Sequence, residues 1–293
     1  MRKIVTHQAP DLDAITSVWL VKKFLPGWEE AEVLFMSAGE TLDDQPVDSD
    51  PNVLHVDTGL GKFDHHQLDE DECAAKKIFD FLRAQSAKRK AQNWNDEVLE
   101  RLTEVVNEID HFGEVFWPNP TADFYDFGLE PILDGLKLIY RHQDQRLVDF
   151  GLEALDGVYK KFQNKVWAEK LIEDEGIEFQ SQWGKGLGIE TTNDEIIPLG
   201  QKLGYQLVVR KDAKKKYVRI KARPEQGINL KKIFEKLKKA DPEATWYFHP
   251  SGTMILNGSM KNPKTKPTKL SLKKLIAFLR GGGENGDGEG KTW

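Results

Sequence analysis

The chain has 293 residues, of which 39% are hydrophobic and 31% charged, a composition typical of a soluble globular protein with one large or two smaller domains. No run of about 18 apolar residues is present, so we expect no membrane span. The N-terminus, MRKIVTHQAPDLDAI, lacks the apolar stretch of a secretory signal. The single cysteine, Cys73, excludes an internal disulfide and a cysteine-built zinc site. We therefore expect a cytoplasmic protein.

The net charge of −6 hides an uneven distribution along the chain. Residues 202–280 contain 21 Lys and Arg but only 5 Asp and Glu, whereas the remainder is strongly acidic. A basic segment of this kind favours an anionic ligand such as a nucleotide or a nucleic acid. A lysine-rich, well-solvated surface is the alternative interpretation.

Strand-like and helix-like patterns alternate in the N-terminal part of the chain, which predicts an α/β fold with a parallel sheet. His7 and Asp57 follow two of the strands, and ligands gather at the carboxyl ends of such strands. The expected strands cover residues 2–6, 32–36 and 53–56. One expected helix begins at Asp13, and two others cover 74–82 and 96–112.

The rest of the chain predicts a helical connector and a smaller α+β domain. Its strands are expected at 205–211, 216–222, 246–248 and 253–256, and its helices at 230–239 and 270–279. The segment WGKGLG (183–188) is expected to be a turn between lobes. We place the boundaries at 1–127 for the parallel-sheet domain, 128–177 for the connector, 178–280 for the basic domain and 281–293 for a glycine-rich, disordered tail.

Histidine and aspartate side chains gather in four places within the first 110 residues. Alone, each place has an ordinary structural interpretation: helix capping, a strand-end turn, surface polarity or a late-helix acid. One metal site explains all four together. The residues are His7, Asp11 and Asp13; Asp57; Asp64, His65 and His66; and Asp110.

These residue types suit divalent cations. Mn²⁺ and Mg²⁺ prefer carboxylate oxygens, and Mn²⁺ also accepts imidazole. Two such ions need a bridging carboxylate and together clamp the reacting oxygens of a phosphate ester. Without a cation, each pair of carboxylates about 4 Å apart would cost on the order of 4 kcal/mol at an effective dielectric constant of 20.

The sequence resembles the DHH phosphoesterase superfamily, which includes RecJ, oligoribonuclease-like and pyrophosphatase-like enzymes. Thr16 departs from the pattern, because a glycine is common at that position. The stretches VDTGLGKFDHHQ and NEIDHFG are also similar to the Myg-type exonuclease family. The matching motifs are HQAPDLDAITS, Asp57, Asp64-His65-His66 and Asp110, followed after the third by the helix ECAAKKIFDFL.

The resemblance implies a catalytic domain with two bound cations, with Mn²⁺ favoured and Mg²⁺ or Co²⁺ as alternatives. One ion would be held by His7, Asp11 and Asp57, and the other by Asp13, Asp57, His65 and Asp110, so that Asp57 bridges them. His66 would face the substrate phosphoryl group, and Asp64 would orient a neighbouring histidine.

The resemblance also makes the basic domain a substrate-binding module. His249, Ser251 and Gly252 match a histidine and a small-residue turn of that module, but Trp246-Tyr247-Phe248 replaces its glycine triplet. Arg219 and Arg223, whose even spacing of four residues puts them on one face of a strand, are further candidates for phosphate binding, although a solvated strand edge explains them equally well. Lysines of the loop 261–269 form a candidate backbone-binding patch.

We therefore expect a metal-dependent phosphodiesterase that acts on nucleotides or on short single-stranded nucleic acid, with no membrane partner. The alternatives are hydrolysis of a small phosphoanhydride such as pyrophosphate, and nucleic-acid binding without turnover. The sequence leaves the exact substrate, the choice between RNA and DNA, the polarity of attack and the oligomeric state open.

Overall fold

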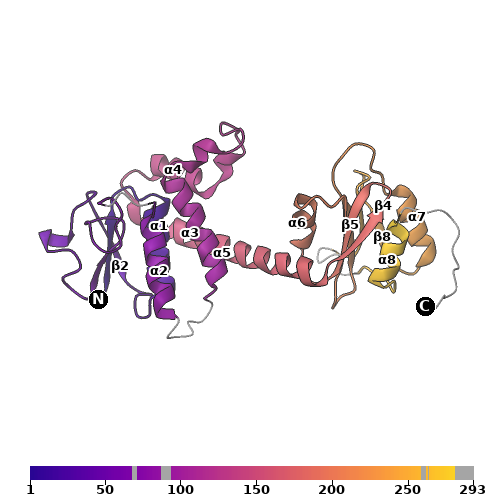
Figure 1. Cartoon of the computed structure of the whole chain (residues 1–293), viewed down its shortest axis with the longest axis horizontal. Helices are drawn as coiled ribbons and strands as arrows, with labels where there is room; N and C mark the ends of the chain where they lie inside the picture. The colour runs from indigo at the N-terminus through magenta and orange to yellow at the C-terminus, as the bar shows by residue number, and fades with distance from the viewer. Residues whose placement is uncertain (68–70, 87–93, 259–261, 263, 281–293) are drawn as a thin grey trace. The chain divides into compact units, whose positions relative to one another are not determined.

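The chain divides into two compact units, Met1–Gln163 and Asn164–Trp293. A computed structural model describes residues 1–67, 71–86, 94–258, 262 and 264–280 (Figure 1). The tail that the sequence predicts to be disordered lies outside these residues. None of the described helices combines the length and apolar character that crossing a bilayer requires.

The first unit contains a parallel three-stranded sheet in the order β2-β1-β3. Its strands are β1 (Lys3–His7), β2 (Glu32–Met36) and β3 (Val53–His55). Val5 of β1 pairs with Leu34 on one side and with His55 on the other. The predicted α/β class with a parallel sheet is confirmed. Because β1 is central, its carboxyl end places His7 beside the ends of both neighbouring strands.

Helices α1 (Leu12–Phe24), α2 (Ala74–Ser86) and α3 (Asp96–Asp110) pack together beside this sheet (Figure 1). Asp11 begins α1, because its carboxylate accepts a hydrogen bond from the Ala14 amide at 3.0 Å. The apolar side chains of α1, including the fully buried Ile15, form the centre of the core. Two further helices follow, α4 (Leu129–Tyr140) and the long α5 (Asp144–Glu175).

The second unit is a mixed six-stranded sheet in the order β4-β5-β6-β7-β9-β8. Strands β5 and β6 are parallel and are joined through α6, whereas the other neighbours are antiparallel. The elements are β4 (Ile177–Ser181), β5 (Gly184–Glu190), α6 (Ile196–Lys202), β6 (Leu207–Lys211), β7 (Val218–Ala222), α7 (Lys231–Ala240), β8 (Trp246–Phe248), β9 (Met254–Asn257) and α8 (Leu272–Leu279).

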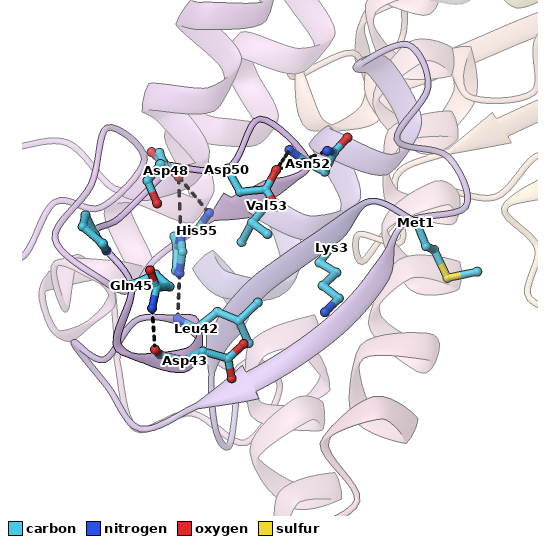
Figure 2. A pocket seen from close by; sticks show the side chains of 12 residues that line it. Met1, Lys3, Leu42, Asp43, Gln45, Asp48, Asp50, Asn52, Val53 and His55 are labelled. Carbon is cyan, nitrogen blue, oxygen red and sulfur yellow. Dashed lines mark hydrogen bonds and ion pairs between the residues drawn. The ribbon is translucent and has the colours of Figure 1, made fainter.

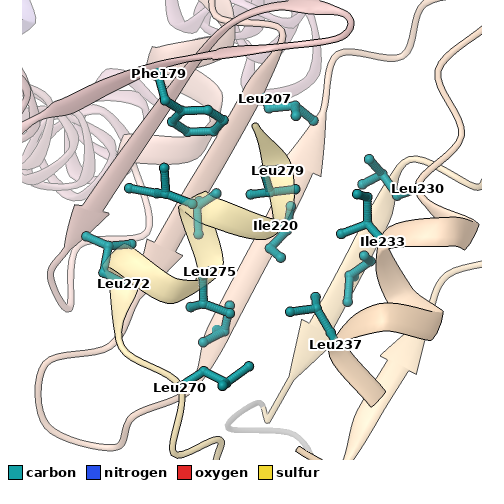
Figure 3. Close-up of a cluster of buried hydrophobic side chains, with 14 of the residues drawn as sticks. Phe179, Leu207, Ile220, Leu230, Ile233, Leu237, Leu270, Leu272, Leu275 and Leu279 are labelled. Carbon is teal, nitrogen blue, oxygen red and sulfur yellow. The ribbon is translucent and has the colours of Figure 1, made fainter. Parts of the chain in front are cut away.

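Both faces of this sheet carry helices. Helices α7 and α8 cover one face, where Leu237 and Leu275 meet strand residues such as Ile220 (Figure 3). Helix α6 packs on the opposite face with Ile196 and Leu199 against Val208. The core under α7 and α8 is mainly aliphatic with Phe179 and further aromatic side chains packed against it, and the core under α6 is aliphatic with Tyr205 at its edge.

The segment 183–188 is expected from its sequence to be a turn, but its residues 184–188 lie within strand β5. Close packing explains why glycine occupies these strand positions, because a Cβ atom at Gly186 would lie 2.3 Å from the Phe179 ring. A Cβ atom at Gly188 would similarly lie 2.6 Å from Ile276 of α8. The strand therefore uses glycine to admit bulky neighbours, which removes the alternating pattern that identifies a strand.

Alanine substitutions at two glycines of α5 are expected to change the free energy of unfolding in opposite directions. A Cβ atom at Gly151 would lie 2.4 Å from Cγ2 of the buried Ile15, whereas no atom lies within 4 Å of a Cβ built at Gly157. We expect Gly151→Ala to lower the free energy of unfolding by about 1–2 kcal/mol through overpacking. Gly157→Ala should raise it by about 0.5–1 kcal/mol through helix propensity. Urea unfolding of both variants measures this, and equal effects would contradict the packing of α5 against α1.

Candidate metal centre

The carboxyl edge of the first sheet carries the acidic and imidazole groups that the sequence singles out. His7 is the last residue of β1, and Asp57 follows β3 by two residues. Asp57 has a φ of +53°, a left-handed conformation that is uncommon for a residue other than glycine. Its amide donates to the Phe63 carbonyl at 2.9 Å, which closes the loop 57–63 directly before the DHH triplet. Strain of this kind often accompanies a functional site.

The Asp57 carboxylate is 2% exposed, and its two oxygens face different partners. Oδ2 lies 3.2 Å from Nε2 of His7. Oδ1 lies 3.5 Å from Nε2 of His65 and 3.8 Å from Nδ1 of His66. Asp57 thus stands between two groups of donor atoms.

The first group consists of His7, Asp11 and Asp57, whose donor atoms all lie within 4.8 Å of one another. Asp11 Oδ2 is 3.6 Å from His7 Nε2, while its other oxygen caps α1. His7 Nδ1 donates to the Gln8 carbonyl at 2.8 Å, which turns Nε2 toward the carboxylates of Asp11 and Asp57. Histidines that bind metals are commonly held through their second nitrogen in this way.

The second group surrounds His65. Its Nε2 lies 3.5 Å from Oδ2 of Asp110 at the end of α3. His111 joins this group, with its Nδ1 3.8 Å from the same Asp110 oxygen. Sequence reasoning did not select His111, although it directly follows Asp110 within NEIDHFG. His111 Nδ1 also donates to the Asn107 carbonyl at 2.9 Å, which leaves Nε2 as its available nitrogen.

Asp13 lies in the same cluster but has partners of its own. Its two oxygens accept the Ala74 and Ala75 amides at the start of α2, both at 2.8 Å. Its Oδ2 is 3.9 Å from His65 Nε2. Burial, together with the negative charges of Asp57 and Asp110, raises the pKa of Asp13 well above its usual value. Asp13 therefore anchors α2 to the cluster, and its role as a metal ligand stays a prediction.

Asp64 has the contacts expected of an orienting carboxylate. It accepts from Nδ1 of His66 at 2.7 Å and from the His66 amide at 3.1 Å. Its second oxygen accepts the Leu60 amide at 2.7 Å. The His66 side chain is 59% exposed, so this contact holds a ring that faces solvent.

The carboxylates of the cluster strongly affect the pKa values of its histidines. Burial disfavours a charged His7, but the carboxylates of Asp11 and Asp57 outweigh it and raise the pKa of His7 to about 11. The Asp57 carboxylate, whose Oδ1 lies 3.5 Å from Nε2 of His65, raises the pKa of His65 to about 9. Burial raises the pKa of Asp110. In the apo protein the histidines therefore supply the positive charge that the carboxylates require.

The donor atoms of the cluster fit a divalent cation. Asp57 Oδ1, His65 Nε2 and Asp110 Oδ2 are all buried without a hydrogen-bond partner among the described residues. Buried polar atoms without partners are costly, and a cation held by two oxygens and an imidazole nitrogen would satisfy them. The clusters thus have the residue types and the spacing for metal binding.

Two cavities border this centre within the first unit. One of about 340 Å³ is lined by His7, Asp57 and His66. The other, of about 400 Å³, is lined by His65 and Asp110 and extends to Phe112 and Glu130. A ligand therefore has space on both sides of Asp57.

A third cavity of about 340 Å³ lies beside β3 and includes none of the predicted site residues (Figure 2). Its buried His55 accepts the Leu42 amide through Nε2 at 3.1 Å. Nδ1 of the same ring lies 3.5 Å from Asp48. His55 thus ties the acidic loop to the sheet.

In the second unit, the structure brings three of the predicted residues together. His249, Ser251 and Gly252 form the turn between β8 and β9, where His249 Nδ1 and Ser251 Oγ are 2.9 Å apart. The Gly252 amide donates to the His249 carbonyl at 3.0 Å, and its φ of +76° explains the glycine.

The two predicted arginines do not join that turn as a pair. Arg219 lies within β7 and binds Asp194 at 2.8 Å. Arg223 follows β7 and binds Glu225 at 3.1 Å. Each guanidinium therefore already has a carboxylate partner, and phosphate binding by either stays a prediction. Residues 261 and 263 of the predicted lysine loop lie outside the described residues.

The family model described as ChrB, C-terminal domain, matches residues 4–162, which is more than half of the chain. The chain belongs to the ChrB C-terminal domain family. This family model spans the whole of the metal cluster, from His7 to His111. It is not a model of the DHH phosphoesterases, so membership of that superfamily stays a prediction. No curated protein matches the sequence.

Several solved structures resemble this ChrB-type chain at low identity. An uncharacterized protein from Helicobacter pylori G27 is 14% identical with a TM-score of 0.26, and the match covers 95% of this chain and 98% of the Helicobacter chain. RecJ from Thermus thermophilus, solved with Mg²⁺, is 11% identical with a TM-score of 0.31, covering 89% of this chain and 47% of its own. A Methanococcus jannaschii protein assigned to the family II inorganic pyrophosphatases is 17% identical with a TM-score of 0.22, covering 96% and 100%. We therefore derive the function from the site itself.

Asp57 is the residue whose replacement should affect both donor groups. Asparagine tolerates the left-handed backbone of position 57, so Asp57→Asn should fold while losing the shared carboxylate. We expect Mn²⁺ affinity, measured by isothermal titration calorimetry, to fall by at least about 100-fold. Asp149→Asn, on the exposed side of α5, is the matched control and should bind as the wild type does. Unchanged Mn²⁺ binding in Asp57→Asn would remove Asp57 from the centre.

Proposed function

We propose that this chain is a dinuclear-metal-dependent phosphoesterase that hydrolyses phosphodiester bonds of nucleotides or of short single-stranded nucleic acid. The observation that carries the proposal is the position of Asp57, whose two oxygens face His7 on one side and His65 on the other. A carboxylate between two donor groups is the arrangement that a pair of divalent cations requires. Mn²⁺ is the favoured ion because both groups combine carboxylates with imidazole.

Some of these side chains would bind the ions, and others would position the substrate or the helix beside them. His7, Asp11 and Asp57 would hold one ion, and Asp57, His65 and Asp110 the other, with Asp13 fixing α2 behind them. When bound, the ions would polarise the phosphoryl group and lower the pKa of a water molecule. His66 would contact a phosphoryl oxygen through Nε2, because its Nδ1 is bound to Asp64.

The basic composition of the second unit supports an anionic, nucleotide-type substrate. The turn of His249, Ser251 and Gly252 is the candidate phosphate contact in that unit. Two other functions compete with this proposal: hydrolysis of a small phosphoanhydride such as pyrophosphate, and nucleic-acid binding without turnover. Each gives a different outcome in the same assays.

Hydrolysis with added Mn²⁺ tests the proposal directly. We expect turnover of dinucleotides, cyclic dinucleotides or short oligonucleotides to exceed turnover of pyrophosphate at one Mn²⁺ concentration. Asp57→Asn should lower kcat by at least about 1,000-fold, while Asp149→Asn retains activity. Faster pyrophosphate hydrolysis would favour the phosphoanhydride function. No hydrolysis by the wild type, together with oligonucleotide binding that Asp57→Asn retains, would favour the non-catalytic function.

Salt dependence distinguishes a nucleic-acid chain from a small ligand. If several lysines neutralise phosphates, oligonucleotide affinity should fall by at least about 100-fold between 50 and 200 mM salt. Fluorescence anisotropy of a labelled oligonucleotide measures this. A flat response would mean that the basic unit does not bind a phosphate backbone.

A further inference from the structure

A small cavity near the metal centre has a different chemical character from those that border it. It lies in the segment between α3 and α4 and has a volume of about 90 Å³. Its polar and aromatic lining comes from Glu114, Trp117, Tyr125 and Glu130, which we call the cage residues. Ile109, Pro120 and Pro131 complete an apolar wall. A cavity this small admits a head group and not a whole nucleotide.

The two rings of the cage have polar ends that are already bound elsewhere. Trp117 Nε1 donates to Glu108 at 3.0 Å, and the Tyr125 hydroxyl donates to the Pro118 carbonyl at 3.0 Å. The ring centroids lie 5.2 Å apart with the planes tilted by 48°. Because neither Glu108 nor Pro118 lines the cavity, the rings offer it π surface and no donor.

The two carboxyl groups of the cage have different surroundings: one oxygen of Glu114 is buried, whereas Glu130 lies near Asp134 and Lys137, whose ammonium group is bound to Asp134 at 2.9 Å. Glu114 Oε2 is buried with no hydrogen-bond partner among the described residues. Burial and a hydrogen bond with Asp134 raise the pKa of Glu130 to about 7. In the sequence, residues 102–136 contain eight acidic residues and no lysine or arginine. The cavity therefore combines π faces with the buried carboxyl oxygen of Glu114 and with Glu130, which a bound cation would shift toward its charged form; this lining attracts a cation and repels an anion.

We propose that the cage residues bind an organic cation, an alkylammonium head group, which packs against the two rings and lies beside the two carboxyl groups. The apolar wall disfavours a hydrated metal ion and suits the weakly hydrated methyl groups of a quaternary ammonium. The ligand class is therefore a small molecule with such a head group, of which choline is the simplest probe.

The position of the cage assigns this cation to the substrate of the metal centre, an extension that rests on the proposed function. Ile109 and Glu130 line both the cage and the cavity of about 400 Å³ that holds His65 and Asp110. A phosphodiester with an ammonium group on one ester arm would place its phosphate at the metal centre and its cation in the cage. Hydrolysis breaks the bond from phosphorus to the leaving oxygen, forms one from water, and transfers the water proton to the departing alcohol.

Choline binding is tested on the full chain in the presence of EDTA, so that the result depends neither on bound metal nor on turnover. Choline and its uncharged isostere 3,3-dimethylbutanol are compared at constant ionic strength by saturation-transfer NMR. We expect saturable binding of choline and at least about tenfold weaker binding of the isostere. Trp117→Leu and Glu114→Gln should each weaken choline binding by about tenfold, whereas Trp117→Phe retains it within about threefold. Glu153→Gln, an exposed glutamate of α5, is the control.

Choline binding that is not saturable overturns the cation site. So does choline binding that Glu114→Gln and Trp117→Leu leave as in the wild type while the isostere binds equally well. Circular dichroism checks the fold of Trp117→Leu, and Glu114→Gln decides the result if that variant unfolds.

Turnover of two chromogenic esters tests the substrate class separately. They are p-nitrophenyl phosphorylcholine and the p-nitrophenyl ester of 3,3-dimethylbutyl phosphate, compared with Mn²⁺ present. Glu114→Gln should lower kcat/KM for the choline ester by about tenfold and leave that for the neutral ester unchanged. Equal effects on both esters would overturn the assignment of the cation to the substrate. If neither ester is hydrolysed while choline binds, the failure lies in the proposed function and not in the cage.

Discussion

The first unit depends on holding several carboxylates together at one edge of a sheet. Asp13 and Asp57 are almost fully buried, and Asp110 lies beside them at the end of α3. Like charges at this spacing repel by several kcal/mol unless they are compensated. Protonated histidines provide one compensation, as the raised pKa values of His7 and His65 indicate. The two α2 amides that Asp13 accepts provide another. A divalent cation would replace the first and leave the second in place.

This arrangement follows from local backbone choices. The central position of β1 places His7 at the middle of the sheet edge, and the left-handed Asp57 turns its carboxylate toward both histidines. The hydrogen bonds of Asp64 then fix the loop on which His65 and His66 sit. The left-handed backbone of Asp57 and the burial of charged groups both cost free energy, which the buried aliphatic core around α1 offsets. The site is therefore stabilised by packing that lies outside it.

The α/β class and the convergence of His7 and Asp57 were predictable, because strand-end residues of a parallel sheet meet at one edge. Strand β5 was not, since its glycines admit Phe179 and Ile276 and so remove the alternating pattern. The pairing of Asp13 with the α2 amides depends on a contact about 60 residues away in the sequence, which no local pattern encodes. The cage was not predictable either, because Tyr125 begins one short 3₁₀ helix (Tyr125–Phe127) and Trp117 follows another (Gly113–Phe116), and such short elements have no periodic pattern.

The charge around the metal centre limits the substrates that the proposed activity can accept. A polyanionic strand that passed over the acidic segment 102–136 would be repelled, and only cations bound at the centre would counter this. Its remaining phosphates would need basic side chains such as those concentrated in the second unit. A compact phosphodiester with its own ammonium group carries no net charge and meets no such barrier. The buried carboxyl oxygen of Glu114, together with Glu130, thus favours a zwitterionic substrate over a long polyanion at this face of the first unit.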